Sequence, residues 1–473
     1  MVSINRRRFL SGAGALGFSG AASRLMGLSA GKAFAADTSG YKALVCIFLK
    51  GGLDHADLII PVDQSSYDLL VNTRAGLMNN YGVGSGTSTR DRANLLTLNA
   101  DNIGDYGGRA FGVAQDVAPL HTLFEDGDLA FVGNVGPLIT PTDRTSYEDL
   151  LVPVPAQLFS HNDQQSTWMS LGTEGERIGW GGRFADQILQ SDPAANENAL
   201  AVTVSSLDVF LSGQNVRQFR ASSNLRGEPS IISNRGIIGG NRRYDMAREE
   251  IAAFFADGDF GHSTLIERDL ASGFAQGIRS FKDFADAVET APELMTVFPD
   301  TSIGGQMRTI AEVIGANGPL GAQRQIFYAT RGGFDTHSNQ TNTLPAIISE
   351  VAEAVAAFRT AMIELGLWDS VTVFSASDFG RTTIDNGDGT DHGWGGHHFV
   401  AGGAVRGRRI YGDVPNADVT SQFYTERRGR LIPTISVEQY GATLGKWFGL
   451  NSAELASVFP NLTNFSTDDL GFL

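Results

Sequence analysis

Acidic and histidine side chains gather in one stretch of the chain, residues 371–405. The stretch begins with an apolar, β-branched run, 371–376, which is typical of a buried strand. Asp378 and Arg381 follow that run directly. Three of the eight histidines then lie within seven residues, at His392, His397 and His398. Open α/β sheets hold their ligands just past the C-terminal ends of strands, so this stretch is predicted to contain a site.

Three other places also carry an acid or a histidine, and two of them follow a predicted strand, 43–49 or 325–330. They are Asp54 with His55, Ser160 with His161 at the start of a predicted helix, and Asp335 with His337. Carboxylates and imidazoles from different strands suit a divalent metal, and mixed oxygen and nitrogen ligation favours zinc, manganese or magnesium over copper or an iron–sulfur centre. A paired metal site would stabilise both oxygens of an ester displacement.

Each of these pairs alone could instead be a helix cap or a turn. A Ser-His-Asp hydrolase would require a G-x-S-x-G turn between strand and helix, and Ser160 lies in the different sequence FSHND. The glycine pairs Gly51-Gly52 and Gly387 with Gly389 lack the spacing of nucleotide-binding loops. Metal chemistry is therefore favoured over both alternatives.

A parallel sheet would bring these places together. The apolar run 43–49 does not alternate with polar residues, which is typical of a parallel strand covered on both faces. Between the strands 325–330 and 371–376, apolar residues recur at the spacing of one helical face and end at Gly366. Strand, helix and strand form a βαβ unit that delivers Asp335 and Asp378 to one edge of the sheet. The fold class is therefore α/β, with a central, mostly parallel sheet flanked by helices.

Two segments differ in character from this α/β pattern. Residues 62–110 are polar and show no clear period, so we predict a long surface excursion. Residues 205–300 hold aromatic and charged helical segments without a strong strand-like run, which predicts a helical insertion or cap. We expect a single domain over residues 36–473.

The N-terminus carries an export signal, residues 1–35. Arg6 and Arg7 begin a twin-arginine motif, which a mild apolar stretch and the cleavage pattern Ala33-Phe34-Ala35 follow. The mature chain would start near Ala36, in the periplasm or outside the cell, after contact with the twin-arginine translocase. An uncleaved anchor is the alternative. No other segment approaches the roughly 20 apolar residues that span a bilayer.

Net charge and cysteine content limit the possible partners and the possible disulfide bonds. The leader is basic, so its removal takes the formal net charge from −16 to −21. Nucleic acid, which requires a basic surface, is not expected as a partner. Cys46 is the only cysteine, so no intramolecular disulfide can form. It lies in an apolar run, where a buried side chain is expected.

Several motifs together resemble one family. They are KGGLDHAD, FSHNDQQSTW, GGRF, GGFDTHSNQ, SDFGRT, GTDHGWGGHHFVAGGAV and the closing IPT and WFGL. With the twin-arginine leader, they resemble the exported bacterial family known as domain of unknown function 1501. That family is grouped with the alkaline phosphatase and sulfatase superfamily, whose members hydrolyse or transfer phosphate and sulfate esters. The resemblance thus implies an anionic ester substrate.

The resemblance also implies roles for individual residues. The implied metal ligands are Asp54, Asp335, His337, Asp378 and His392, and the implied nucleophile is Ser160. We place His161 and Arg381 with Ser160 in the catalytic part, and we expect a divalent metal: zinc, or else manganese, magnesium or calcium. The chain departs from the superfamily pattern at two places. The superfamily spaces its first Asp-and-His metal pair as D-x-x-x-H, whereas this chain has D-T-H at residues 335–337. The superfamily also has a histidine after the second aspartate, where this chain has Phe379. One metal, a different metal or a site without catalysis are all compatible with them.

The leading hypothesis is an exported, metal-dependent hydrolase of phosphate or sulfate esters. The alternative is a non-catalytic binding or assembly protein on the same fold.

Overall fold

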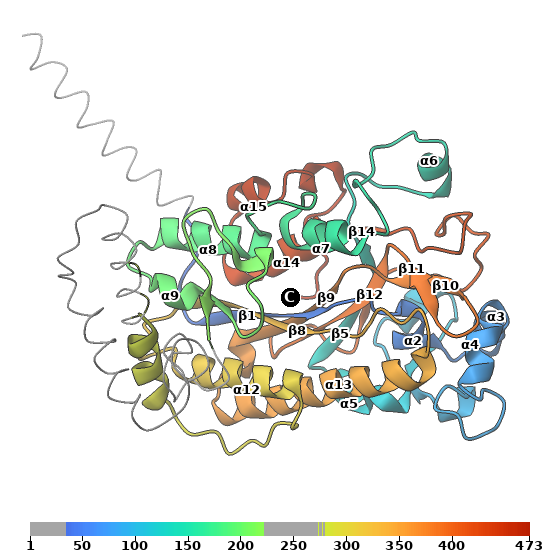
Figure 1. Cartoon of the computed structure of the whole chain (residues 1–473), viewed down its shortest axis with the longest axis horizontal. Helices are drawn as coiled ribbons and strands as arrows, with labels where there is room; N and C mark the ends of the chain where they lie inside the picture. Colours follow the sequence, from blue (N-terminus) through green and yellow to red (C-terminus); the bar gives the residue numbers. More distant parts are fainter. Residues whose placement is uncertain (1–34, 222–272, 274–276, 278–279) are drawn as a thin grey trace, which may run out of the picture.

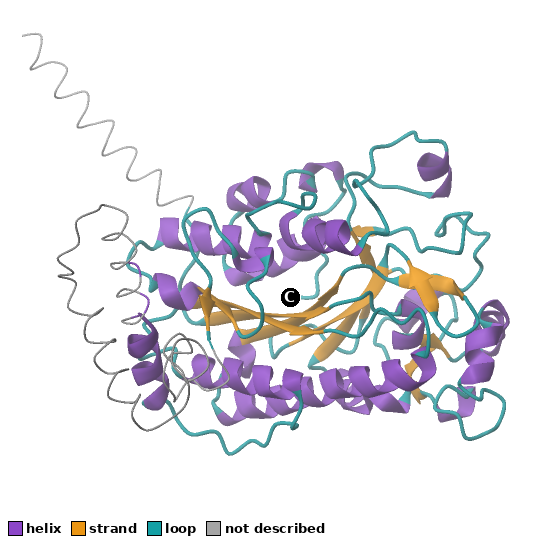
Figure 2. Cartoon of the chain, viewed as in Figure 1, coloured by secondary structure: helices purple, strands orange, loops and turns teal. Residues whose placement is uncertain are grey.

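A nine-stranded sheet between two layers of helices forms the centre of the molecule (Figures 1 and 2). The computed structural model describes residues 35–221, 273, 277 and 280–473. The strands are β1 (Lys42–Leu49), β5 (Leu129–Gly136), β6 (Ala201–Thr203), β7 (Phe219–Arg220), β8 (Arg324–Arg331), β9 (Val371–Ser377), β12 (Gly396–Ala401), β13 (Ile410–Gly412) and β14 (Ile435–Ser436). Their order is β13-β5-β12-β9-β1-β8-β6-β7, with β14 also paired to β5. All pairs are parallel except the two made by β12, so the predicted fold class is confirmed.

The central strand β1 is buried on both faces, which explains its unbroken apolar sequence. Val45 and Ile47 pack into one hydrophobic cluster, and Cys46 and Phe48 pack into a second on the opposite face. The first layer consists of α5 (Ala118–Glu125), α12 (Ser302–Gly315) and α13 (Gln340–Glu364). The second consists of α7 (His161–Ser170), α8 (Trp180–Ser191), α14 (Val437–Phe448) and α15 (Ser452–Val458). Cys46 is 1% exposed, as its apolar surroundings in the sequence predict.

The predicted βαβ unit is present as β8, α13 and β9. The apolar stripe of α13 is buried, and Gly366 adopts the left-handed conformation (φ +68°) just past the helix end. Strands β8 and β9 both pair in parallel with β1, one on each side. Their C-terminal ends therefore lie at the same edge of the sheet, where Asp335 and Asp378 follow them.

The prediction that residues 62–110 form a surface excursion is wrong. The segment contains α3 (Gln64–Thr73), α4 (Ala75–Asn80), and strand β3 (Leu96–Thr97), which forms a small sheet with β2 (Ile60–Pro61) and β4 (Phe111–Val113). Leu70, Leu77 and Met78 are buried. Elements this short show too few repeats for a period to be visible in the sequence. Arg74 and Arg90 are also buried, so this polar segment packs charges inward.

Two predicted segments lie largely outside the described residues. The leader, 1–35, is outside them except for its last residue. Of the predicted insertion, 205–300, the described flanks contain β7, which extends the sheet beside β6, and a helical segment at 280–289. The helical insertion as a whole stays a prediction. In the described part of the chain, no helix is both long and apolar enough to cross a membrane.

Candidate functional site

Three imidazoles converge on the carboxylate of Asp335 at the C-terminal edge of the sheet. The Nε2 atoms of His161, His337 and His392 lie 3.4, 3.1 and 3.3 Å from an Asp335 oxygen. The Nε2 atoms of His337 and His392 are themselves 2.8 Å apart. One ligand atom from each of His161, Asp335 and His392 falls within 4.8 Å of the others. We call these four residues the histidine cluster.

The other ring nitrogen of each histidine faces an oxygen that accepts a hydrogen bond. The acceptors of Nδ1 are the Asp378 carboxylate for His161 (2.6 Å), the Phe159 carbonyl for His392 (2.7 Å) and the Asp391 carboxylate for His337 (3.1 Å). Each Nδ1 therefore donates a proton, which leaves the lone pair of Nε2 directed into the cluster. Outer partners of this kind orient the histidines that bind metal ions in proteins.

A strained turn delivers the first of these histidines. His161 opens α7, and the two residues Gln157 and Phe159 before it adopt the left-handed conformation (φ +53° and +74°). Such a conformation is costly for residues with a side chain, and residues held in it cluster at functional sites. The turn presents the Phe159 carbonyl to His392 while it points His161 toward Asp335.

Arg381 fixes the position of Asp335. Its guanidinium is completely buried and donates to Asp335 Oδ1 (2.7 Å) and to the carbonyls of Gly51 (2.9 Å) and Thr390. Arg381 lies on β10 (Arg381–Asp385) directly across from His392 on β11 (Thr390–His392), so one hairpin supplies both residues. Gly51 must be glycine, because a Cβ there would lie 2.2 Å from the backbone nitrogen of Asp335.

Electrostatics put three of the four cluster residues, Asp335, His337 and His392, in the form that binds a cation. Burial acts to raise the pKa of Asp335, but the hydrogen bond and charge of Arg381 outweigh it and lower that pKa, so the carboxylate is ionised. Burial lowers the pKa of His337 and of His392, which keeps both imidazoles neutral. The hydrogen bond to Asp378 raises the pKa of His161. An ionised carboxylate and neutral imidazoles are the forms that bind a metal ion.

Asp378, which the sequence predicts as a metal ligand, reaches the histidine cluster through His161. Its buried carboxylate accepts from His161 Nδ1, from Gln165 Nε2 (2.8 Å) and from the Gly51 amide (3.1 Å). These three donors engage both oxygens of the Asp378 carboxylate. His161, which the sequence places in the catalytic part, belongs to the group of side chains that could hold a metal ion.

Asp54, also predicted as a metal ligand, contacts a buried arginine and not the cluster. Its Oδ2 accepts from Arg74 Nη2 (2.6 Å) and from Gln340 Nε2 (2.6 Å), and its Oδ1 caps the short helix α2 (His55–Leu58). Arg74 comes from the segment that the sequence assigns to the surface. The structure therefore does not bring Asp54 to the histidine cluster, and its role as a metal ligand stays a prediction.

Replacing Asp54 by alanine should destabilise the protein by about 3–5 kcal/mol, because it leaves the buried Arg74 charge without its partner. The folded fraction should keep its metal content. Denaturant unfolding and metal analysis of the same preparation measure the two effects. Asp286→Ala, which breaks the exposed Lys282–Asp286 pair, is the control and should change little. Loss of metal from folded Asp54→Ala would restore Asp54 as a ligand.

The remaining histidines of the sequence stretch belong to the core. The His397 ring packs edge-on against His55 with centroids 5.3 Å apart, and His398 packs against Trp168 at 4.9 Å. Burial lowers the pKa of His55 and of His398 to about 3, so both rings are neutral. Of the three closely spaced histidines, only His392 reaches the cluster.

Ser160, the predicted nucleophile, lies next to His161 at the N-terminus of α7. Its hydroxyl donates to Asp163 Oδ2 (2.8 Å) and does not cap the helix. Nothing in the described contacts joins its Oγ to the histidine cluster, so its role stays a prediction.

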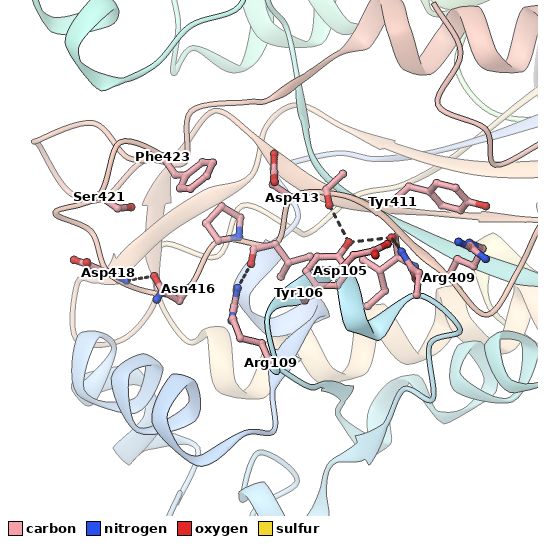
Figure 3. Close-up of a pocket in the computed structure, with 15 residues that line it drawn as sticks. Asp105, Tyr106, Arg109, Arg409, Tyr411, Asp413, Asn416, Asp418, Ser421 and Phe423 are labelled. Carbon is pink, nitrogen blue, oxygen red and sulfur yellow. Dashed lines mark hydrogen bonds between the residues drawn. The ribbon is translucent and has the colours of Figure 1, made fainter. Parts of the chain in front are cut away.

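A separate pocket of about 750 Å³ lies beside β13 and contains none of the histidine cluster (Figure 3). Some of its polar groups bond one another, while the buried Ser421 hydroxyl has no hydrogen-bond partner among the described residues. The Tyr106 hydroxyl donates to the carbonyls of Ile410 (2.9 Å) and Gly412 (2.8 Å), and Arg109 donates to the Val414 carbonyl. No group of metal-binding side chains lines this pocket in the described part of the chain, so the histidine cluster is the better candidate for metal chemistry.

Comparisons with known proteins agree with part of the sequence interpretation. The family model described as Protein of unknown function (DUF1501) matches residues 285–432. This range contains Asp335, His337, Arg381 and His392 but not His161, and it confirms the resemblance over that part of the chain. No curated protein matches the sequence.

Similar solved structures share little sequence with this chain. Ps i-CgsB in complex with k-i-k-neocarrahexaose is 10% identical, with a TM-score of 0.35, over 90% of this chain and 77% of that one. The lipoteichoic acid synthase LtaP from Listeria monocytogenes is 8% identical, with a TM-score of 0.33, over 92% and 80%. A Bacteroides thetaiotaomicron protein from work on glycosaminoglycan metabolism is 9% identical, with a TM-score of 0.36, over 88% and 74%. These values are too low to assign a function or a site.

Proposed function

We propose that this protein is a metal-dependent hydrolase of phosphate or sulfate esters. The observation that carries the proposal is the shared orientation of three imidazoles, each held by an oxygen at Nδ1 and directed at Asp335 through Nε2. Three imidazole nitrogens and one carboxylate are a donor set that zinc prefers, and manganese also accepts it. His161, Asp335 and His392 would hold the ion, with His337 beside them.

The surrounding residues would prepare the site for an anionic ester. A bound divalent cation supplies positive charge that stabilises oxyanions and lowers the pKa of a nearby hydroxyl or water. Asp378 and Arg381 hold His161 and Asp335 in place, so neither side chain has to reorient during a reaction. The N-terminus of α7, where Ser160 lies, offers backbone N–H groups and the positive end of the helix dipole to an anion.

A second candidate, a binding or assembly protein with the same metal site, is favoured by one observation. The Ser160 hydroxyl is engaged by Asp163 and no described contact links it to the cluster. In this alternative the metal orders the site and no ester is cleaved.

Hydrolysis of model esters separates the two candidates. Purified protein is incubated with 4-nitrophenyl phosphate and 4-nitrophenyl sulfate after loading with zinc, manganese, magnesium or calcium, and again after chelator treatment. The hydrolase predicts turnover that the chelator abolishes and the metal restores. Metal bound in stoichiometric amount with no turnover of either ester class would favour the binding protein.

We further propose that the protein reaches the periplasm or the exterior through the twin-arginine translocase. Replacing Arg6 and Arg7 by lysine should block export, because lysine keeps the charge but lacks the planar, multiply donating guanidinium. Fractionation of cells that express either form gives the measurement. Replacing Arg24 by lysine in the same leader is the control and should leave export intact. Normal export of the double variant would contradict a twin-arginine route.

A further inference from the structure

An arginine-rich loop lies beside the histidine cluster in an otherwise acidic chain. The sequence Thr425-Glu-Arg-Arg-Gly-Arg-Leu431 follows β13 and precedes β14. It is held as a tight turn, because Thr425 N donates to the Arg430 carbonyl (2.9 Å) and Tyr424 forms a β-bridge with Leu431. The Gly429 carbonyl accepts from Thr383 N (3.0 Å), which ties the loop to β10.

Arg430 touches both backbone segments that build the cluster. Its Nε donates to the His392 carbonyl (3.0 Å). Its guanidinium lies over the Phe159 ring, 3.8 Å from the centroid, within the range of a cation–π contact. The side chain is thus pinned between the peptide of one cluster residue and the turn that precedes another.

This guanidinium has no carboxylate partner among the described residues. Two nearby arginines do have one, because Arg428 pairs with Asp391 and Arg381 pairs with Asp335. Arg430 is half-buried, and burial lowers the pKa of its guanidinium, which reflects the cost of a cation partly removed from water. Only Nε of its five N–H donors is used in the described contacts, so the two terminal nitrogens remain available.

We propose that Arg430 binds a second anionic group of the substrate, a carboxylate, phosphate or sulfate next to the ester that is cleaved. Arg430 is anchored at the His392 carbonyl and not at the Nε2 that faces Asp335, so its ligand lies beside the cluster and not within it. A stacked, planar guanidinium suits two parallel hydrogen bonds to one oxyanion. The inference rests on the proposed function for the ester, and it narrows the substrates to esters with two charged groups.

A matched pair of ligands tests this inference without turnover. Phosphoglycolate and ethyl phosphate are both phosphate monoesters. Phosphoglycolate carries a carboxylate at the position where ethyl phosphate carries a methyl group. Isothermal titration calorimetry on the zinc-loaded protein should show phosphoglycolate binding about ten- to a hundredfold more tightly, as expected for a hydrogen-bonded ion pair. Arg430→Gln should remove that preference and leave the affinity for ethyl phosphate unchanged. Arg430→Lys, which keeps the charge but not the planar fork, should lie between the two.

Arg427→Gln is the matched control, because it removes the same charge from the same loop at an exposed position without an ion pair in the described residues. It should keep the preference for phosphoglycolate. Equal loss in both variants, no loss in Arg430→Gln, or no binding of either ligand would overturn the inference. So would a fall in zinc content or melting temperature of Arg430→Gln, which marks a structural role.

The result also separates this inference from the proposed function. Arg430-dependent binding of phosphoglycolate in a protein that cleaves no ester would leave the anion site standing and remove the hydrolase. Ester hydrolysis by the wild type, together with an Arg430→Gln variant that keeps its preference for phosphoglycolate, would support the hydrolase and remove the anion site.

Discussion

Replacing His392 by alanine should lower the affinity of the protein for zinc by more than about a hundredfold. His392 offers its Nε2 to the cluster and is held at Nδ1 by the Phe159 carbonyl, so the substitution removes a ligand and frees the turn before His161. Loss of an orienting partner alone typically costs ten- to a hundredfold in metal affinity, and loss of the ligand itself should exceed that. The melting temperature should fall too, because metal binding to the native state contributes to folding free energy.

His398→Ala provides the control for this measurement. His398 follows six residues later but packs in the core against Trp168, and its Nδ1 lies near Ser375 Oγ (3.3 Å). Its removal should destabilise the fold by leaving a cavity, while the folded protein should still bind zinc in full. A His392→Ala variant that binds zinc like the wild type would place His392 outside the site.

Replacing Ser160 by alanine should reduce ester turnover by on the order of 10³ or more if the protein is a hydrolase and this serine is its nucleophile. Stability should change little, because the hydroxyl donates to Asp163 and does not cap α7. The measurement is turnover under saturating 4-nitrophenyl ester with metal content verified beforehand. A large loss of rate at constant metal content and constant melting temperature is the expected pattern.

Ser166→Ala, on the same helix, is the matched control. Its hydroxyl donates to the Thr173 carbonyl (2.7 Å), so the change should cost about 1 kcal/mol of stability and leave the rate intact. Turnover by Ser160→Ala within a few-fold of the wild type would exclude this serine as nucleophile.

The sheet was predictable from the sequence because its central strands are continuous apolar runs. The predicted strands 43–49 and 371–376 differ from β1 and β9 by one residue at one end. The βαβ rule then placed Asp335 and Asp378 at one edge without any knowledge of contacts. Both acids do lie there, each in contact with His161.

The partners of these acids were not predictable from the sequence. The sequence around an aspartate at a strand end does not show whether its carboxylate contacts a metal, an imidazole or an arginine. In the structure Asp378 contacts the imidazole of His161, and Asp54 contacts the guanidinium of Arg74. Arg74 joins Asp54 from a segment whose helices were too short to recognise. The turn at Phe159 that brings His161 to the cluster likewise depends on left-handed backbone conformations at Gln157 and Phe159, which the sequence does not predict.

The position of β12 in the sheet has a consequence for the nascent chain. In the described structure β5 pairs with β12, β13 and β14, all of which follow it by roughly 260 residues or more. At ordinary translation rates, a ribosome needs on the order of 10 to 50 s to make that length of chain. During that time the hydrogen-bonding edges of an apolar strand have no native partner. Synthesis of this protein should therefore depend on chaperones that shield residues 129–136 until residues 396–436, which contain β12, β13 and β14, emerge.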